Sequence, residues 1–229
     1  MKVENIFFHS TSNFLFVLRD FFDVDILRSK QTKITSSDNI GELGIYEDSF
    51  RVKKTWYQIW NKKNLPNQIK KFSQVIFPPQ IRKLQNTKCN VPWHQDWMYL
   101  SKKIMPEKPH EDFCVCFIPF NDNPSEYPTV EFVNNPKQIK LKHKQKFESK
   151  FNSFFLDDEF YNIYSFDLNF GDAIIFGNHV VHRTCVKEND KDGRLSQEFR
   201  ITTEESRLNG KDYYDLNSNK LDIYFKDKD

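Results

Sequence analysis

The sequence is poor in cysteine, and the few cysteines it has do not form a recognised cluster. The 229 residues include four, namely Cys89, Cys114, Cys116 and Cys185. No C-x-x-C pair occurs among them, so neither a zinc cluster nor a thioredoxin-type site is expected. Cys114 and Cys116 alternate within one apolar run, where they share a strand face and are badly placed for a mutual disulfide. We therefore expect buried free thiols in a reducing compartment.

A strong charge of either sign is also missing. The chain has 34 Lys and Arg against 32 Asp and Glu, a formal net charge of +2, which does not favour nucleic acid or a membrane surface as partner. It has no run of about 18 apolar residues that could span a membrane. The stretch "MKVENIFFHSTSNF" has too short an apolar core, and no small-residue cleavage site, for a signal peptide. We expect a soluble, cytoplasmic protein of unknown oligomeric state.

Aromatic residues are plentiful, at 16% of the chain with 23 Phe, and supply one sizeable core. No Pro-, Gly- or Ser-rich linker divides the sequence, so we expect a single domain over residues 1–229. Residues 1–80 are mixed, and we expect them to pack on the rest. Their expected elements are a short helix in "NFLFVLRDFF" (13–22), a strand in "FRVKKTWYQIW" (50–60) and a helix over 64–77 that ends at Pro78.

Short strands dominate residues 81–205. "FCVCFIPF" (113–120) and "TVEFVNN" (129–135) each predict a strand, "IYSFDLNFGDAIIFGNHVVHRT" predicts two around a Gly171–Asp172 turn, and "RLSQEFRITTEES" predicts another. Strands at intervals of about ten residues with turn signals between them indicate a β-sandwich or jelly-roll barrel. The fold class is therefore mainly β with flanking helices, followed by a polar tail over 206–229.

A candidate metal site lies in "NVPWHQDWMYL" (90–100), which contains His94 and Asp96. This H-x-D spacing is a weak signal alone, because His110 and Asp112 repeat it. A third ligand is available in "GDAIIFGNHVVHRT", where His179 and His182 are three residues apart. They face opposite sides of a strand, so only one of them can point into a barrel.

Taken together, these segments resemble the phytanoyl-CoA dioxygenase family of Fe(II)/2-oxoglutarate oxygenases. "PWHQD" and "GDAIIFGNHVVHRT" are similar to the two metal-binding blocks of the family, and the likeness covers residues 85 to about 201. It implies a double-stranded β-helix, the jelly-roll barrel of the cupins, with His94, Asp96 and His182 as iron ligands. The second H-x-D falls in a variable linker and His179 on an outward position, so neither is expected to bind metal. Two histidines and one carboxylate leave three positions of the metal open for 2-oxoglutarate and O₂.

The resemblance also implies an anchor for 2-oxoglutarate in "RLSQEFR". The far carboxylate of a dicarboxylate is best held by an arginine fork. We expect Arg194 to bind the 5-carboxylate and Ser196 to add a hydroxyl donor. Arg200 lies on the same strand face, and we expect it to be a structural or supporting residue.

Other anchors remain open at this point. Lys187 or Lys191 would replace Arg194 if the chain followed the prolyl-hydroxylase pattern, and the loop between His182 and Arg194 is longer than in the resembled family. For the 1-carboxylate end the candidates are Gln85 and Asn90.

The resemblance implies a dioxygenase that hydroxylates an unactivated C–H bond of a small molecule, with Fe(II), 2-oxoglutarate and O₂. Asp96 favours hydroxylation over halogenation, because halogenating relatives lack this carboxylate. The alternatives are a peptidyl or protein hydroxylase of the same fold, or a non-catalytic cupin-like binding protein. The substrate itself is not encoded in a motif, and Trp93, Trp97 and Tyr99 are tentative residues of its entrance.

Overall fold

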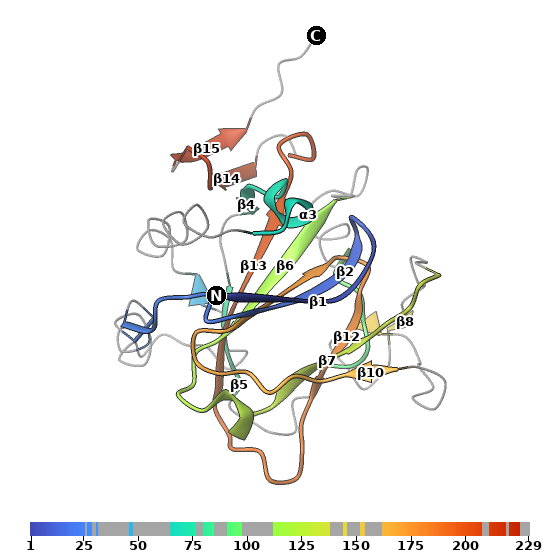
Figure 1. The fold of residues 1–229 in the computed structure, drawn as a ribbon, viewed down its shortest axis with the longest axis vertical. Helices are drawn as coiled ribbons and strands as arrows, with labels where there is room; N and C mark the ends of the chain where they lie inside the picture. The colour runs from blue at the N-terminus through green and yellow to red at the C-terminus, as the bar shows by residue number, and fades with distance from the viewer. Residues whose placement is uncertain are drawn as a thin grey trace.

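The computed structural model describes residues 1–25, 27–28, 31, 46–47, 65–76, 80–84, 91–97, 112–137, 144–145, 152–153, 162–207, 211–218 and 220–224. These residues form a main antiparallel sheet, a smaller three-stranded sheet that faces it and a separate two-stranded ladder (Figure 1). Among the helices described, none is both long and apolar enough to cross a membrane.

The main sheet contains ten strands from all parts of the chain. Its hydrogen-bonded order is β1-β2-β11-β6-β13-β4-β14-β15, with β5 also paired to β13 and β3 paired to β5. The strands are β1 (Lys2–Ser10), β2 (Asn13–Arg19), β3 (Tyr46–Glu47), β4 (Gln74–Ile76), β5 (Gln80–Leu84), β6 (Phe113–Pro119), β11 (Ala173–Gly177), β13 (Arg194–Thr202), β14 (Lys211–Asp215) and β15 (Lys220–Tyr224).

The smaller sheet has the order β10-β7-β12. Its strands are β10 (Ile163–Tyr164), β7 (Thr129–Val133) and β12 (Val181–Cys185), and a short 3-10 helix, η1 (Pro124–Glu126), precedes β7. The remaining ladder pairs β8 (Lys144–Gln145) with β9 (Asn152–Ser153). Two facing antiparallel sheets of this kind make a jelly roll, so the predicted fold class is confirmed.

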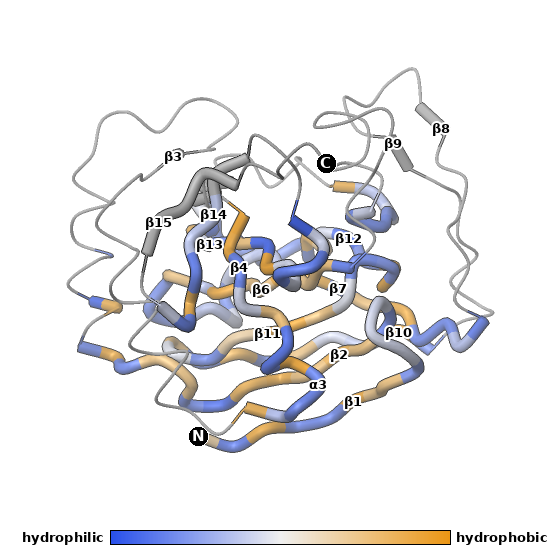
Figure 2. Tube along the Cα trace, turned by 90° about the horizontal axis from the view of Figure 1, so that it is seen from above, coloured by the Kyte–Doolittle hydropathy of each residue, from blue (hydrophilic) through white to orange (hydrophobic). Residues whose placement is uncertain are grey.

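Two apolar cores form on the two faces of the main sheet. The inner core joins the sheets, because Phe132 of β7 packs with Phe117 of β6 and Phe176 of β11. The outer core covers the other face, where Cys114 and Cys116 are buried beside Ile69 of the short helix α3 (Asn67–Lys70). Figure 2 shows the apolar residues concentrated along β2, β11 and β6. The predicted buried free thiols are confirmed at Cys114 and Cys116.

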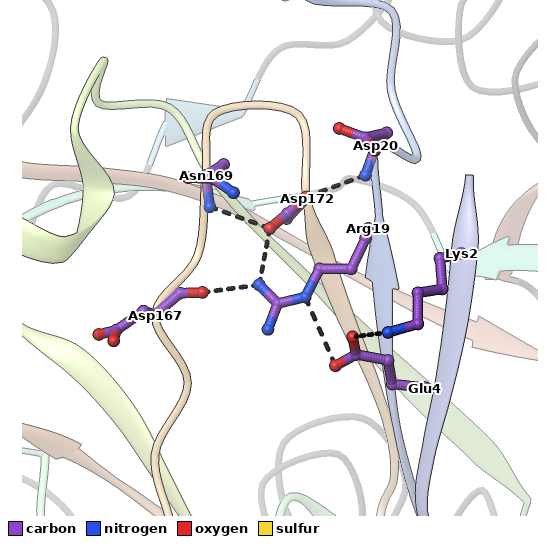
Figure 3. A network of polar contacts seen from close by, with 7 residues as sticks. All are labelled: Lys2, Glu4, Arg19, Asp20, Asp167, Asn169 and Asp172. Carbon is purple, nitrogen blue, oxygen red and sulfur yellow. Dashed lines mark hydrogen bonds and ion pairs between the residues drawn. The ribbon is translucent and has the colours of Figure 1, made fainter.

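The predicted Gly171–Asp172 turn is present directly before β11, and hydrogen bonds attach it to the end of β2, where Arg19 and Asp20 contact Asp172 (Figure 3). Gly171 has φ +105°, a conformation that L side chains rarely adopt. The buried Asp172 carboxylate accepts hydrogen bonds from the backbone N–H groups of Asp20 and Asn169, both at 2.9 Å, and from Nη1 of Arg19 at 2.8 Å. The Gly-Asp pair of the motif therefore has a structural role, because it holds the start of β11 against the end of β2.

The prediction of a helix over 13–22 is wrong, since Asn13–Arg19 is strand β2. This strand pairs with β1 on one side and β11 on the other, and its residues from Asn13 to Leu18 are buried. A strand covered on both faces is apolar throughout and does not show the alternation that identifies a half-exposed strand.

Two further predictions need correction at the sheet end that carries β14 and β15 (Figure 1). The helix expected over 64–77 is reduced to the four residues of α3, because β4 follows and pairs with both β13 and β14. The expected polar tail contains β14 and β15, with Tyr213, Tyr214 and Leu216 buried. In both segments, strand pairing with distant parts of the chain outweighs the preference that the local sequence pattern indicates. Strands β6, β7, β11 and β13 are confirmed, and the strand expected at 50–60 lies outside the described residues. The single strand expected to carry both His179 and His182 is divided into β11 and β12, and His179 lies in the turn between them.

Candidate metal centre

The two histidines of the predicted site lie opposite each other on neighbouring strand segments. The N–H of His94 donates to the carbonyl of His182 at 2.9 Å, and the N–H of His182 donates back to the carbonyl of His94 at 3.0 Å. The segment that starts at Val91 thus extends the smaller sheet beside β12. Directly paired residues of antiparallel strands project their side chains to the same face. Main-chain pairing alone brings the two imidazoles together, with ring centroids 4.1 Å apart.

Asp96 completes the cluster from the same segment. Its Oδ1 lies 3.5 Å from Nε2 of His94 and 3.6 Å from Nε2 of His182. All three residues are buried, and one ligand atom from each lies within 4.8 Å of the others. Two nitrogen ligands and one oxygen ligand on one side of a point fit the facial triad of non-haem iron enzymes.

The hydrogen bond of Nδ1 in each imidazole determines which ring nitrogen carries the hydrogen. Nδ1 of His94 lies 2.7 Å from the carbonyl of Pro92, and Nδ1 of His182 lies 2.9 Å from the carbonyl of Val180. A carbonyl can only accept a hydrogen bond, so Nδ1 carries the hydrogen in both rings. The lone pair is therefore on Nε2, directed at Asp96, as a metal ligand requires.

The protonation states of Asp96 and His182 also suit metal binding. Burial raises the pKa of Asp96, but the positive charge of Arg200 and the contacts with the two histidines outweigh this effect and hold that pKa well below its ordinary value. Burial lowers the pKa of His182 to about 3, and the neighbouring His94 adds to the shift. At neutral pH the cluster therefore contains a carboxylate and a neutral imidazole at these two positions, the forms that bind metals.

These shifts predict acid sensitivity of the metal-free protein. The pKa of His182 falls from 6.5 to about 3 on folding, so between these values the unfolded chain binds a proton that the folded chain does not. Stability must therefore decrease as the pH falls through this window, with a contribution from His182 of up to about 1.4 kcal/mol per pH unit. Denaturant unfolding of the metal-free protein at several pH values measures the slope. His182→Gln is expected to have a shallower slope, and an equal slope in both proteins would contradict the prediction.

Arg194, the predicted co-substrate anchor, lies in the pocket that contains the three ligands. The pocket is lined by Val91, His94, Asp96, Phe117, Val130, Phe176, His182, Arg183, Thr184, Arg194 and Glu198. Only 3% of Arg194 is exposed, its Nη1 donates to the carbonyl of Pro128 at 3.3 Å, and its guanidinium lies 5.6 Å from the ring centroid of Phe117.

Ser196 is completely buried two residues further along β13, and among the described residues its hydroxyl has no hydrogen-bond partner. A buried cation in the metal pocket and an unsatisfied hydroxyl on the same strand face fit a bound carboxylate.

Lys191, an alternative to Arg194, pairs with Glu126 on the surface, with Nζ and Oε2 2.7 Å apart. Lys187 lines a second pocket, on which Arg194 also borders. His179 stands outside the three-residue cluster, and its carbonyl accepts a hydrogen bond from Gln95. Four other candidates, Gln85, Asn90, Tyr99 and His110, lie outside the described residues.

The two tryptophans of the motif have different positions. Trp93 packs against Val133 and Val181, and the guanidinium of Arg183 lies 4.3 Å from its ring centroid. Val181 and His182 alternate along β12, so Trp93 is on the outer face of the smaller sheet, opposite the metal ligands. We therefore withdraw Trp93 from the predicted entrance. Trp97 is half-buried, and its Nε1 donates to Oε1 of Gln95 at 2.9 Å.

Sequence reasoning did not single out three polar residues that line the metal pocket, Arg183, Thr184 and Glu198. Strand parity could have identified Thr184 and Glu198. Thr184 is two residues after His182 on β12, and Glu198 is two residues after Ser196 on β13, so each shares the face of a predicted site residue.

The comparisons with known proteins support the architecture. No family model and no curated protein matches the sequence. Among solved structures, the epimerase SnoN from nogalamycin biosynthesis, in complex with Fe³⁺, alpha ketoglutarate and nogalamycin RO, has a TM-score of 0.58 at 12% identity, over 84% of this chain and 80% of SnoN. The chain has the jelly-roll fold of this enzyme. EctD from S. alaskensis, with 2-oxoglutarate and 5-hydroxyectoine, has a TM-score of 0.57 at 11% identity, over 86% of this chain and 74% of EctD. HygX from Streptomyces hygroscopicus, with iron bound, has a TM-score of 0.53 at 10% identity, over 84% of this chain and 83% of HygX.

Proposed function

We propose that the protein is an Fe(II)- and 2-oxoglutarate-dependent dioxygenase that hydroxylates a C–H bond of a small molecule in the cytoplasm. The observation that carries the proposal is the convergence of Nε2 of His94, Nε2 of His182 and Oδ1 of Asp96 in a pocket that also contains Arg194. The solved structures of similar fold support it, because several were determined with iron or 2-oxoglutarate bound.

Each residue has a distinct part in this proposal. His94, His182 and Asp96 hold iron, which together with 2-oxoglutarate supplies the oxidising chemistry when bound. Arg194 binds the 5-carboxylate of 2-oxoglutarate, with Ser196 as an additional donor, and so directs the other end of the molecule to the metal. The apolar residues Val130 and Phe176 limit access of water to the pocket.

Hydroxylation and a small-molecule substrate are the more specific part of the proposal. Asp96 supports hydroxylation over halogenation, because the carboxylate occupies the position that a halide would take. The named small molecules in the structures of SnoN and EctD support a small-molecule substrate. Trp97 lies directly after Asp96, and we retain it, with Tyr99, as a candidate for the substrate entrance.

The experiment that tests the proposal is an anaerobic titration of the Fe(II)-loaded protein with 2-oxoglutarate. Chelation of iron by the 1-carboxylate and keto oxygen is expected to produce a visible charge-transfer band, and admission of O₂ is expected to release succinate slowly without a substrate. A metal-loaded protein with neither the band nor succinate release would instead fit a non-catalytic binding protein of the same fold.

A further inference from the structure

The carboxylate of Asp96 has its two oxygens in different environments. Oδ2 accepts hydrogen bonds from two nitrogens of Arg200, Nε at 3.2 Å and Nη2 at 3.0 Å. Oδ1 points the other way and lies 3.5 and 3.6 Å from the Nε2 atoms of His94 and His182. The arginine thus occupies one oxygen and leaves the other for the metal position.

We infer that Arg200 is a positioning residue that makes Asp96 a one-oxygen ligand and thereby keeps a coordination position open. A carboxylate can bind a metal through one oxygen or through both. With one oxygen, the three protein ligands of a six-coordinate ion leave three positions, enough for a two-atom chelate and O₂. With both oxygens, one of these positions is lost. The inference rests on the proposed function for the use of that open position.

The scaffold around Arg200 suits such a role. Arg200 lies within β13, where it pairs with Val115 of β6 near the middle of the main sheet, whereas Asp96 belongs to the segment that extends the smaller sheet. The side chains are 12% and 4% exposed, so water does not compete strongly for the contact. Hydrogen bonds between a charged donor and a charged acceptor are stronger than those between neutral groups. The contact therefore links the two sheets and fixes the rotation of the carboxylate.

Arg200→Met tests the inference because it removes both hydrogen-bond donors to Oδ2 and retains an unbranched side chain that fills part of the same space. The matched control is Arg19→Met, which breaks a different contact between arginine and a buried aspartate, the 2.8 Å pair of Arg19 with Asp172 (Figure 3). Arg200→Lys keeps a cation near Oδ2. Each protein is loaded with Mn(II) after labelling of its aspartates with ¹³C, and a metal-minus-apo infrared difference spectrum is recorded. The separation of the asymmetric and symmetric carboxylate stretches is larger when one oxygen binds the metal than when both do.

We expect a wide separation in the wild-type protein and in Arg19→Met, a narrow one in Arg200→Met, and an intermediate or wide one in Arg200→Lys. A separation in Arg200→Met equal to that of the wild-type protein would overturn the inference, as would a narrow separation in the wild-type protein. If Arg200→Met does not fold, Arg200→Leu, which also lacks a donor, is measured in its place, with the same narrowing expected.

A second readout connects this role to the co-substrate. In the Fe(II) form, Arg200→Met should lose about tenfold or more in 2-oxoglutarate affinity, because the second oxygen of Asp96 would occupy a position that the co-substrate needs. Its metal affinity should fall less than that, because the same second oxygen adds a bond to the metal and offsets part of the loss that removal of a supporting residue causes. Equal losses of both affinities would indicate a merely structural role and would overturn the inference. If the wild-type protein binds metal but not 2-oxoglutarate, the proposed function fails, and the infrared spectra still decide how Asp96 binds the metal.

Discussion

His182→Ala is expected to abolish stoichiometric metal binding. The substitution removes one of three buried ligands, and alanine leaves a cavity at a position where Nε2 faces Oδ1 of Asp96 at 3.6 Å. Loss of a residue that only supports a ligand typically costs 10–100-fold in metal affinity, so loss of a ligand itself should cost more than about a hundredfold. Equilibrium dialysis against Fe(II) under anaerobic conditions, followed by metal analysis, measures the effect.

Two other histidines provide the controls for this experiment. His179→Ala changes a histidine three residues earlier that is not part of the described cluster, and it should retain metal. His110→Ala changes the second H-x-D of the sequence and should also retain metal. Loss of metal in His110→Ala with normal binding in His94→Ala would show that the second H-x-D, and not the first, supplies the metal ligands.

Arg194→Ala is expected to weaken 2-oxoglutarate binding by about ten- to a hundredfold, because charge-assisted hydrogen bonds contribute roughly 1.5–3 kcal/mol. The metal should remain bound, since Arg194 is not a ligand. Titration of the charge-transfer band measures the dissociation constant in the same sample in which metal content is determined.

The matched control for Arg194 is Lys191→Ala, which removes a cation of the neighbouring loop that pairs with Glu126 at the surface. It should bind 2-oxoglutarate normally. A large loss in Lys191→Ala combined with unchanged affinity in Arg194→Ala would instead support the prolyl-hydroxylase type of anchor.

The strands that could be predicted are those with clear local signals. β6 and β13 follow from apolar or alternating runs between turn residues, and the start of β11 follows from Gly171–Asp172. β2 could not be predicted, because pairing on both sides and burial on both faces remove its alternation. β14 also depends on a distant partner, β4, and short charged strands of this kind have little local signal.

At the candidate site, too, some features could be predicted from the sequence and others could not. The residue types and the family resemblance were enough to select His94, Asp96 and His182, and strand parity placed Arg194 and Arg200 on one face of β13. The residue that Arg200 contacts could not be predicted, because it depends on how the two sheets face each other. The register that pairs His94 directly with His182 is likewise a property of the folded sheet.

The main-chain pairing of His94 with His182 has a consequence for metal selectivity. Two of the three ligands are held by backbone hydrogen bonds in which the metal takes no part, so we expect uptake of an ion to require little ordering of the chain. The choice among ions is then left to ligand chemistry and supply, and the Irving–Williams order places Co²⁺, Ni²⁺ and Cu²⁺ above Fe²⁺ at such nitrogen and oxygen ligands. Protein purified in air or over a nickel resin should therefore carry other metals in place of iron, and inactivity of such a preparation would reflect its metal content.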